Sequence, residues 1–329
     1  MHLLLGNLNN QIKLMAVLDP PLPFNAGLEE LVKAEVIFLR GEQEPEPLFA
    51  AQGGPLFRRV SGEGRGARVA AVDSSCRRIG ETLRGTIYAT RVACVLCREK
   101  KVLGHMRLGP FLSYLTDDML ARLARPLPLQ DLLAVDPGFA ERFLRRMAER
   151  WLQRQLVLEG ELDYLLIDGP LTFPLPEPPP YGLRALLDEA RKRGTALLGL
   201  SKTTRLRALM KALSYLGRAE DAPCYMKVRE PDAGAIATYV VRLTKGGECF
   251  RLDLDERACT IEGALLDLRR NDALTAGYPE GLRLAHHLCV IGDVDMASVA
   301  SYIMAKLGAQ QVSFLPRRRL LLPVPGPRA

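Results

Sequence analysis

Two aspartates, Asp73 and Asp168, each follow an apolar run of the sequence. Val69–Val72 leads directly into the first, and Leu165–Ile167 leads into the second. An aspartate in such a place often begins a turn, because its side chain can hydrogen-bond the backbone two residues on. If the two runs are parallel strands of one sheet, however, both carboxylates leave at the same edge, where open α/β sheets bind their ligands. Neighbouring strands lie about 4.8 Å apart, so the pair could share a metal ion.

A third carboxylate would complete a site that hydrolyses phosphodiesters with two metal ions, because such sites gather carboxylates around a phosphate. Mg²⁺ and Mn²⁺ favour oxygen ligands. Our candidate is Glu149, which lies two residues from both Met147 and Trp151, at the border of the apolar stripe of a predicted helix. The alternative is a solvated glutamate paired with Arg145 or Arg146, and position alone favours that alternative. Other candidates are Glu141, Glu159 and Glu161.

Lys202 ends a further predicted strand at the same edge of the sheet as the aspartates. A lysine there could hold a phosphate, and the alternative is an ordinary exposed lysine. The surrounding stretch, GTALLGLSKTT, is similar to a phosphate-binding P-loop. A P-loop needs adjacent Gly and Lys, whereas two residues separate Gly199 from Lys202 and the stretch 194–199 is typical of a strand. We therefore expect no ATP hydrolysis by this chain.

The composition is that of a soluble globular protein, with 48% hydrophobic and 25% charged residues in a chain of 329. The net charge of +7 favours a polyanionic partner, since phosphate neutralisation dominates nucleic-acid affinity, although many basic proteins bind no polyanion. We find no apolar stretch long enough to span a membrane and no signal peptide at the start of the sequence. We therefore expect a cytoplasmic protein without membrane association.

The chain has seven cysteines, and Cys94 and Cys97 form its single CxxC motif. A zinc site would need a second pair of cysteines, or histidines at ligand spacing, and the sequence shows neither. The motif lies in a strand-like run, so we expect core thiols. Few histidines are available for imidazole chemistry: His2, His105, His286 and His287.

The predicted elements follow the order strand, meander, helix, strand, helix, strand, which is typical of a mixed sheet with helices on its faces and right-handed later crossovers. The predicted strands are 68–73, one or two within 81–101, 162–168 and 195–202, and a second meander at 235–243 and 248–255. The predicted helices are 116–127, 136–158, 183–194, 279–293 and 295–308. We divide the chain into an N-terminal extension for partner or dimer contacts (1–62), a main domain (63–310) and a basic, proline-rich tail (311–329).

Four segments, VAAVDSS, LLIDGPL, LLGLSK and YPEGLRLAHHL, occur in the order found in NurA nucleases. Each motif is weak alone, and their order and spacing over about residues 65–300 make the resemblance specific. The resemblance implies an RNase H-like core, usually dimeric, that cuts DNA with Mn²⁺ or Mg²⁺. It also implies a partner, the hexameric DNA-translocating ATPase HerA. The expected function is resection of DNA ends in double-strand break repair, as a 5′–3′ exonuclease, a single-strand endonuclease or both.

The resemblance also assigns catalytic residues. Its acidic motifs fall on Asp73 and Asp168, and the glutamate between them falls best on Glu149. These three residues would hold the metal ions. The late histidine of the family follows an alanine, which selects His286 over His287 as a catalytic residue.

Other assignments are further from the expected chemistry. A further acidic position of the family maps to Asp253. The residues expected to bind DNA phosphate are Lys202, Arg77 and Arg78. One departure from the family is Ser74, which replaces the glycine of an Asp-Gly-Ser motif and so changes the turn but not the carboxylate. The N-terminal region is too divergent to assign any partner-binding residue.

Two other functions compete with this interpretation. One is a catalytically weak DNA-clamping or adaptor subunit that docks on the ATPase, which the loss of a metal carboxylate would favour; the sequence shows no such loss. The other is a different RNase H-like enzyme, such as a structure-specific endonuclease. Cleavage of linear ends or of junctions would separate these possibilities.

Overall fold

The structure is a computed structural model in which the chain forms two compact units, Met1–Ile291 and Gly292–Ala329. The described residues are 49–50, 54–55, 57–81, 85–124, 138–171, 182–202, 222–229 and 235–307. The predicted extension over 1–62 therefore lies mostly outside the described residues, and the predicted tail over 311–329 lies entirely outside them. The predicted domain boundaries remain predictions.

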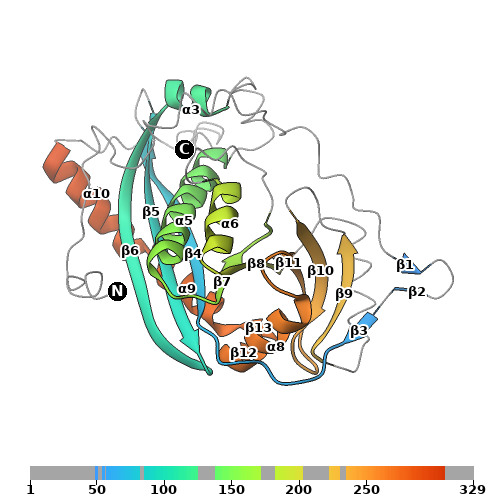
Figure 1. The fold of residues 1–329 in the computed structure, drawn as a ribbon. Helices are drawn as coiled ribbons and strands as arrows, with labels where there is room; N and C mark the ends of the chain where they lie inside the picture. The colour runs from blue at the N-terminus through green and yellow to red at the C-terminus, as the bar shows by residue number, and fades with distance from the viewer. Residues whose placement is uncertain are drawn as a thin grey trace, which may run out of the picture. The chain divides into compact units, whose positions relative to one another are not determined.

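A nine-stranded sheet runs through the first unit (Figure 1). In spatial order, its strands are β3 (Phe57–Arg59), β9 (Cys224–Arg229), β10 (Ile236–Arg242), β11 (Cys249–Asp255), β8 (Ala196–Ser201), β7 (Tyr164–Asp168), β4 (Val69–Glu81), β5 (Gly85–Arg98) and β6 (Lys101–Thr116). β4, β5 and β6 form an antiparallel meander, and β7 and β8 run parallel to β4. The predicted mixed sheet flanked by helices is confirmed.

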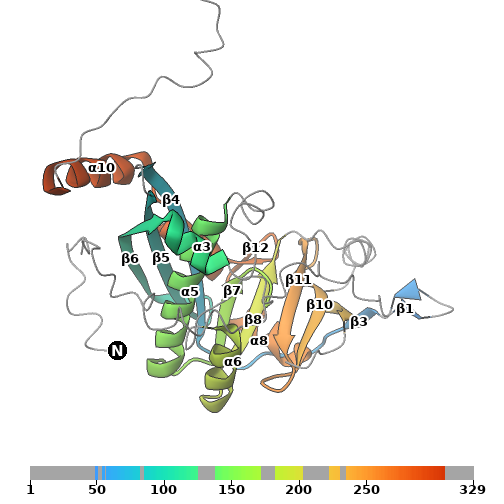
Figure 2. The ribbon, with the colours of Figure 1, turned by 90° about the horizontal axis from the view of Figure 1, so that it is seen from above.

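Two helices connect the parallel strands, because parallel neighbours need a crossover rather than a tight turn. α5 (Phe139–Glu159) precedes β7, and α6 (Leu183–Lys192) lies between β7 and β8. The two helices lie side by side on one face of the sheet (Figures 1 and 2). Leu152 of α5 and Leu186 of α6 share a buried cluster with Val72 of β4, so this face is sealed from water.

The opposite face of the sheet is covered by α8 (Ile261–Asn271) and α9 (Glu280–Cys289). Side chains of a strand alternate between the two faces. Val69 and Ala71 therefore join the cluster that contains α8, whereas Ala70 and Val72 join the cluster on the α5 face. Because β4 is buried on both faces here, its apolar run is continuous rather than alternating.

The sequence analysis predicted that this strand ends at Asp73, but β4 continues to Glu81. Its antiparallel pairing with β5 extends to Glu81, whereas its parallel pairing with β7 stops at the Val72–Ile167 pair. The apolar run ends where the pairing with β7 ends, because the rest of β4 has a neighbouring strand on one side only and is less buried. Asp73 thus marks the point where β7 and β4 diverge.

Four antiparallel strands, β11, β10, β9 and β3, widen the sheet beyond β8. The pairing of β10 with β11 confirms the predicted second meander. The predicted strands within 81–101 are β5 and the start of β6, which continues to Thr116. The sequence analysis did not predict β3 or β9. The remaining described elements of this unit are β1 (Phe49–Ala50), β2 (Gly54–Pro55), α3 (Asp117–Ala124), β12 (Leu274–Thr275) and β13 (Tyr278–Pro279).

The predicted helix over 279–293 is shorter in the structure, where α9 ends at Cys289; α10 (Asp293–Leu307) belongs to the second unit. By length and composition alone, the stretch Glu280–Lys306 is apolar enough to span a membrane, although the sequence analysis expected no such stretch. The stretch contains both helices, and within the first unit Ala285 of α9 packs against β5.

The seven cysteines are all free thiols. Cys94 and Cys97 are buried in β5, one on each face of the sheet, which confirms the prediction of core thiols. Two further thiols are buried, Cys224 in β9 and Cys289 at the end of α9.

Candidate active site

Asp73 is the centre of a group of polar contacts on β4, where its side chain is only 2% exposed. One carboxylate oxygen, Oδ1, accepts a hydrogen bond of 2.7 Å from the amide of Ser74. The other, Oδ2, lies 2.7 Å from Nδ1 of His286 on α9. Which atom donates depends on the tautomer of the imidazole. The strand and the helix are therefore joined through the two residues that the sequence analysis selected.

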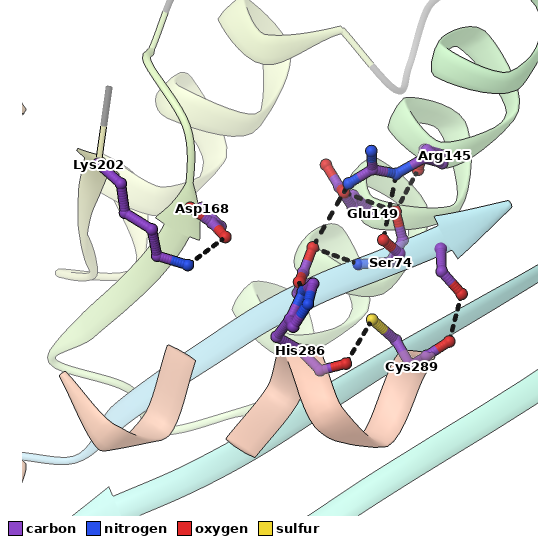
Figure 3. Close-up of polar contacts among 9 residues, drawn as sticks. Ser74, Arg145, Glu149, Asp168, Lys202, His286 and Cys289 are labelled. Atoms are coloured by element: carbon purple, nitrogen blue, oxygen red, sulfur yellow. Dashed lines mark hydrogen bonds and ion pairs between the residues drawn. The ribbon is translucent and has the colours of Figure 1, made fainter. Parts of the chain in front are cut away.

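The register of β4 and β7 brings Asp168 beside Asp73. The last parallel pair is Val72 with Ile167, so both aspartates follow at the next position of neighbouring strands. Burial raises the pKa of Asp168; the charge of Lys202 lowers it, and the charge of Asp73 raises it further. Lys202 Nζ lies 3.5 Å from Oδ2 of Asp168, and Figure 3 shows this side chain pointing to the carboxylate.

Glu149 reaches the same region from α5 and is buried. Ser74 Oγ donates a hydrogen bond of 2.6 Å to its Oε1. Burial raises the pKa of Glu149, while the positive charges of Arg146 and Arg145 lower it. Glu149 is therefore not solvated, although it does pair with Arg145 as that alternative held. α5 brings this carboxylate next to the residue that follows Asp73.

Arg145 contacts two of the three predicted metal ligands, whereas the sequence analysis named it only as a possible partner of Glu149. Its Nη2 lies 3.7 Å from Oδ1 of Asp73 and 4.0 Å from Oε1 of Glu149 (Figure 3). Its Nε donates to the carbonyl of Ser74. The four-residue spacing between Arg145 and Glu149 on a helix was a signal for the second contact. The contact with Asp73 depends on the packing of α5 on β4 and has no local signal.

Tyr278 is a second residue that sequence reasoning missed. Lys202 Nζ lies 4.4 Å from the centre of its ring, which is within the range of a cation–π contact. Burial, followed by the charge of Asp168, raises the pKa of its buried hydroxyl. Tyr278 thus completes the surroundings of Asp168 and Lys202 from β13, a strand too short to be predicted from its pattern.

Asp253 has a different environment from the other carboxylates. It is fully buried in β11, where it accepts hydrogen bonds from the amide of Leu171 and from Nε of Arg251, both of 2.9 Å. The first of these holds the chain just after Asp168. Gly199 allows this crossing, because a Cβ there would lie 2.7 Å from the carbonyl oxygen of Gly169. The geometry makes Asp253 a support for the loop after β7, and its match to a further acidic position remains a prediction.

The carboxyl end of α9 is held by side chains of β4 and β5. Ser75 Oγ donates to the carbonyl of Cys289, and Arg91 Nη1 donates to that of Val290 at 2.8 Å. Arg77 Nη1 donates to the carbonyl of Ile291 at 3.2 Å. Cations suit a helix carboxyl end, where unpaired carbonyls carry partial negative charge. We call these three contacts the α9 clamp.

The two arginines predicted to bind phosphate thus differ in their contacts. Arg77 is exposed and belongs to the α9 clamp, whereas Arg78 is exposed and pairs with Glu81 at 2.5 Å. Their role toward DNA remains a prediction. The two histidines are both exposed, with ring centroids 6.1 Å apart, and of the two it is His286 that contacts Asp73.

Comparison with known proteins identifies the family. The NurA domain matches residues 67–291, and no curated protein matches the chain. The crystal structure of NurA bound to dAMP and manganese aligns with 75% of this chain and 90% of its own, at 12% identity and a TM-score of 0.50. The crystal structure of the NurA nuclease from Sulfolobus solfataricus aligns with 77% of this chain and 87% of its own, at 16% identity and a TM-score of 0.49. The catalytic domain of human endonuclease V aligns with 76% of this chain and 92% of its own, at 16% identity and a TM-score of 0.40.

At such identities the structural likeness concerns the fold alone, and the manganese-bound NurA supports the same sheet architecture. The domain match carries the assignment because it spans more than half of the chain. Its range extends from just before β4 to just after α9 and so contains Asp73, Glu149, Asp168 and His286. The chain therefore belongs to the NurA family of nucleases.

Proposed function

We propose that the protein is a metal-dependent deoxyribonuclease that hydrolyses phosphodiester bonds at DNA ends, as a 5′–3′ exonuclease, a single-strand endonuclease or both. One observation carries the proposal. The parallel pairing of β4 with β7 sets Asp73 and Asp168 at equivalent positions of adjacent strands, and α5 adds Glu149 through Ser74. Three neighbouring elements thus each contribute a carboxylate, and a phosphodiester-hydrolysing metal site would draw these carboxylates together, since their oxygens do not all lie within 4.8 Å of one another.

The donor set fits Mn²⁺ or Mg²⁺, which favour oxygen ligands. Burial raises the pKa values of Glu149 and Asp168, which means that their negative charges lack sufficient compensation where they lie. A divalent cation would supply that compensation, and Asp73, Glu149 and Asp168 would hold it. Bound there, the metal would activate water and stabilise charge on the leaving oxygen. A manganese-bound NurA structure is consistent with this choice of metal.

The other side chains of the site would bind and orient the DNA. His286 is held through Nδ1 by Asp73, and its side chain is 53% exposed, so the second ring nitrogen can face a scissile phosphate or its attacking water. Lys202 is 48% exposed and lies beside Asp168, where its ammonium can bind a phosphate oxygen. We propose that Arg77 and Arg78 bind the DNA backbone further along β4.

We further propose that the protein resects DNA ends in double-strand break repair, in the cytoplasm, as a homodimer with a HerA-type hexameric ATPase. The partner, the dimer and the repair role are what the resemblance to NurA nucleases implies, and the chain belongs to that family. The net charge of +7 suits a DNA partner. The sequence has no P-loop to drive movement along DNA, so a separate ATPase would have to supply the strand.

The test uses end-labelled linear DNA incubated with the full-length protein and Mn²⁺, Mg²⁺ or EDTA. We expect cleavage with at least one metal, none with EDTA, and none by Asp73→Asn. Asp188→Asn is the matched control, because Asp188 is an exposed carboxylate on α6 paired with Arg191, and it should cleave like the wild type. Cleavage in EDTA, or full activity of Asp73→Asn, would refute the assignment. Binding without cleavage would favour the adaptor, and cleavage of junctions only would favour a structure-specific endonuclease.

A further inference from the structure

The candidate active site contains a thiol for which the proposed reaction has no use. Cys289 lies on α9 three residues after His286, a spacing that sets two side chains on the same face of a helix. Its Sγ, a ring nitrogen of His286 and a carboxylate oxygen of Asp73 all lie within 4.8 Å of one another. Among the residues that the structure describes, this is the single group of three or more His, Cys, Asp or Glu side chains with such spacing.

The chemistry of this donor set differs from that of the three carboxylates. Sulfur, nitrogen and oxygen together are the ligands of Zn²⁺, which binds them tetrahedrally, whereas Mg²⁺ and Mn²⁺ favour oxygen. Two ligand atoms of a tetrahedral zinc lie roughly 3.3–3.6 Å apart, given zinc–ligand bonds of about 2.0–2.3 Å. The present separations, all within 4.8 Å, exceed that spacing by at most about 1.5 Å, so side-chain rotations can close the site. Cys289 and Asp73 are buried, but His286 is exposed, which leaves an approach for the ion and room for water as the fourth ligand.

We propose that Asp73, His286 and Cys289 form a binding site for a thiophilic divalent cation such as Zn²⁺, and that its occupation inhibits the nuclease. As the zinc–sulfur bond forms, the thiol proton passes to the buffer, and the neutral imidazole carries its proton on the nitrogen that does not bind the ion. The hydrogen bond from Cys289 Sγ to the carbonyl of His286 is given up in exchange.

Inhibition follows because the two sites share residues, so this part of the inference depends on the proposed nuclease function. A zinc ion on Asp73 takes a carboxylate away from the Mn²⁺ or Mg²⁺ site. It also engages a ring nitrogen of His286, the imidazole that the proposed reaction uses. Zinc would thus compete with the activating metal through a thiol that the activating metal does not use.

The direct test measures metal binding without DNA. Full-length, metal-free protein is titrated with Co²⁺, a spectroscopic substitute for Zn²⁺, and the thiolate-to-cobalt charge-transfer band is recorded. We expect the band in the wild type, its loss in Cys289→Ala and its displacement by Zn²⁺. Cys94→Ala is the matched control, because Cys94 is a buried thiol on the other face of the sheet, and it should keep the band. A band that survives in Cys289→Ala, or a wild type without one, would overturn the proposal.

A second variant guards against misfolding of Cys289→Ala. His286→Ala changes an exposed side chain, and it should weaken Zn²⁺ binding in a calorimetric titration by at least about tenfold. Unchanged affinity would count against the site.

Inhibition is measured with DNA as a ratio to the zinc-free rate of each variant in excess Mn²⁺. Cys289→Ala should need at least about tenfold more Zn²⁺ than the wild type; equal sensitivity would mean that zinc acts at the carboxylates alone. If the protein cuts no DNA while the cobalt band behaves as expected, the metal site stands and the proposed nuclease function fails.

Discussion

The three predicted metal ligands lie in unequal surroundings, and this inequality decides what their removal should do to stability. Glu149 and Asp168 are the two whose pKa values are raised by burial, so each carries a charge that folding opposes. Glu149→Gln and Asp168→Asn should therefore abolish cleavage while the thermal midpoint stays the same or rises. Unfolding scans in EDTA, beside the DNA assay, measure both. A large fall in the midpoint would mean that these side chains serve the fold rather than metal binding.

The adjacent histidines offer a second contrast. Both are exposed, and of the two it is His286 that contacts Asp73. His286→Ala should slow cleavage by about 100-fold or more, the usual size of a general acid–base contribution, with little change in DNA affinity. His287→Ala should be milder. Single-turnover rates and binding isotherms for both variants decide the matter, and an essential His287 would show that the alignment of this helix with the family is off by one residue.

At this scale the sequence was informative about residue types and less so about surroundings. The apolar runs before Asp73 and Asp168 were sufficient to predict two carboxylates on parallel strands, because strand pairing alone brings them together. Position alone favoured a solvated Glu149, since a residue at the border of an apolar stripe is buried or exposed according to what packs on the helix. The contact with Ser74 depends on how α5 lies on β4, which no local pattern reports.

At the scale of elements, the α9 clamp determines where His286 lies. Arg91 is buried on β5 and donates to the carbonyl of Val290. Arg91→Ala removes this donor and should destabilise the protein by about 1–3 kcal/mol. It should also slow cleavage, because the end of the helix that carries His286 is released, and Arg91→Lys should restore part of the rate.

Urea unfolding and the DNA assay test this prediction. Arg78→Ala is the control for stability, because Arg78 is an exposed arginine on β4 with a surface ion pair, and such pairs contribute about 0–1 kcal/mol. Equal losses of stability in the two alanine variants would show that the clamp does not hold α9.

Asp272 joins the end of α8 to the start of α9 and makes stability depend on pH. Its carboxylate accepts from the amide of Gly281, and burial raises its pKa from 3.8 to about 6. The folded state thus binds the proton of Asp272 more tightly than the unfolded state does. The stabilisation that this proton gives the folded state is complete below about pH 4 and is lost as the pH rises through 6. Asp272→Asn keeps an acceptor but cannot ionise. Relative to the wild type, the free energy of unfolding of Asp272→Asn should increase by on the order of 2–3 kcal/mol as the pH rises from 4 to 7.

Urea unfolding at several pH values tests this, since the titrations common to both proteins cancel in the difference. Asp188→Asn, an exposed substitution, is the control and should show little gain. A difference in unfolding free energy between the wild type and Asp272→Asn that does not change with pH would contradict the assigned pKa.

Element boundaries were predicted less well than element types. The predicted strand over 68–73 is the buried part of β4, and periodicity could not show its extension to Glu81, because the exposed half of a strand lacks the apolar signal. Similarly, the predicted helix over 279–293 ended early at Cys289. Its end is fixed by Ser75, Arg77 and Arg91, which are distant in the sequence.

At the scale of the whole molecule, the meander and two parallel strands followed from the sequence, and the wider sheet did only in part. β10 and β11 are apolar enough to be predicted, whereas β3 has only three residues and is too short for a periodic signal. β9 was missed although it is as long as β8. β9 pairs with the edge of β10, and β3 pairs in turn with β9. The widened sheet supports the site through Asp253 of β11, which holds the loop after Asp168.

The molecule as a whole should need a separate motor. The sequence has no P-loop, and 196–201 is a strand, β8, as expected. Purified protein should therefore hydrolyse no ATP, with or without DNA, and ATP should stimulate resection only after a HerA-type hexamer is added. Phosphate release and cleavage measured in the same reactions test this. DNA-stimulated ATP hydrolysis by this chain alone would contradict it.

The spacing of Asp73, Ser75 and Arg77 also limits how this protein can change in length. These alternate residues of β4 contact α9 and the residues just after it, at His286, Cys289 and Ile291. A one-residue insertion among them would turn every later side chain to the other face. An insertion of two would keep the face but displace the contacts by about 6.6 Å, more than one helical turn of about 5.4 Å. Insertions and deletions should therefore be confined to the loops, while the stretch of strand that holds the helix keeps its length.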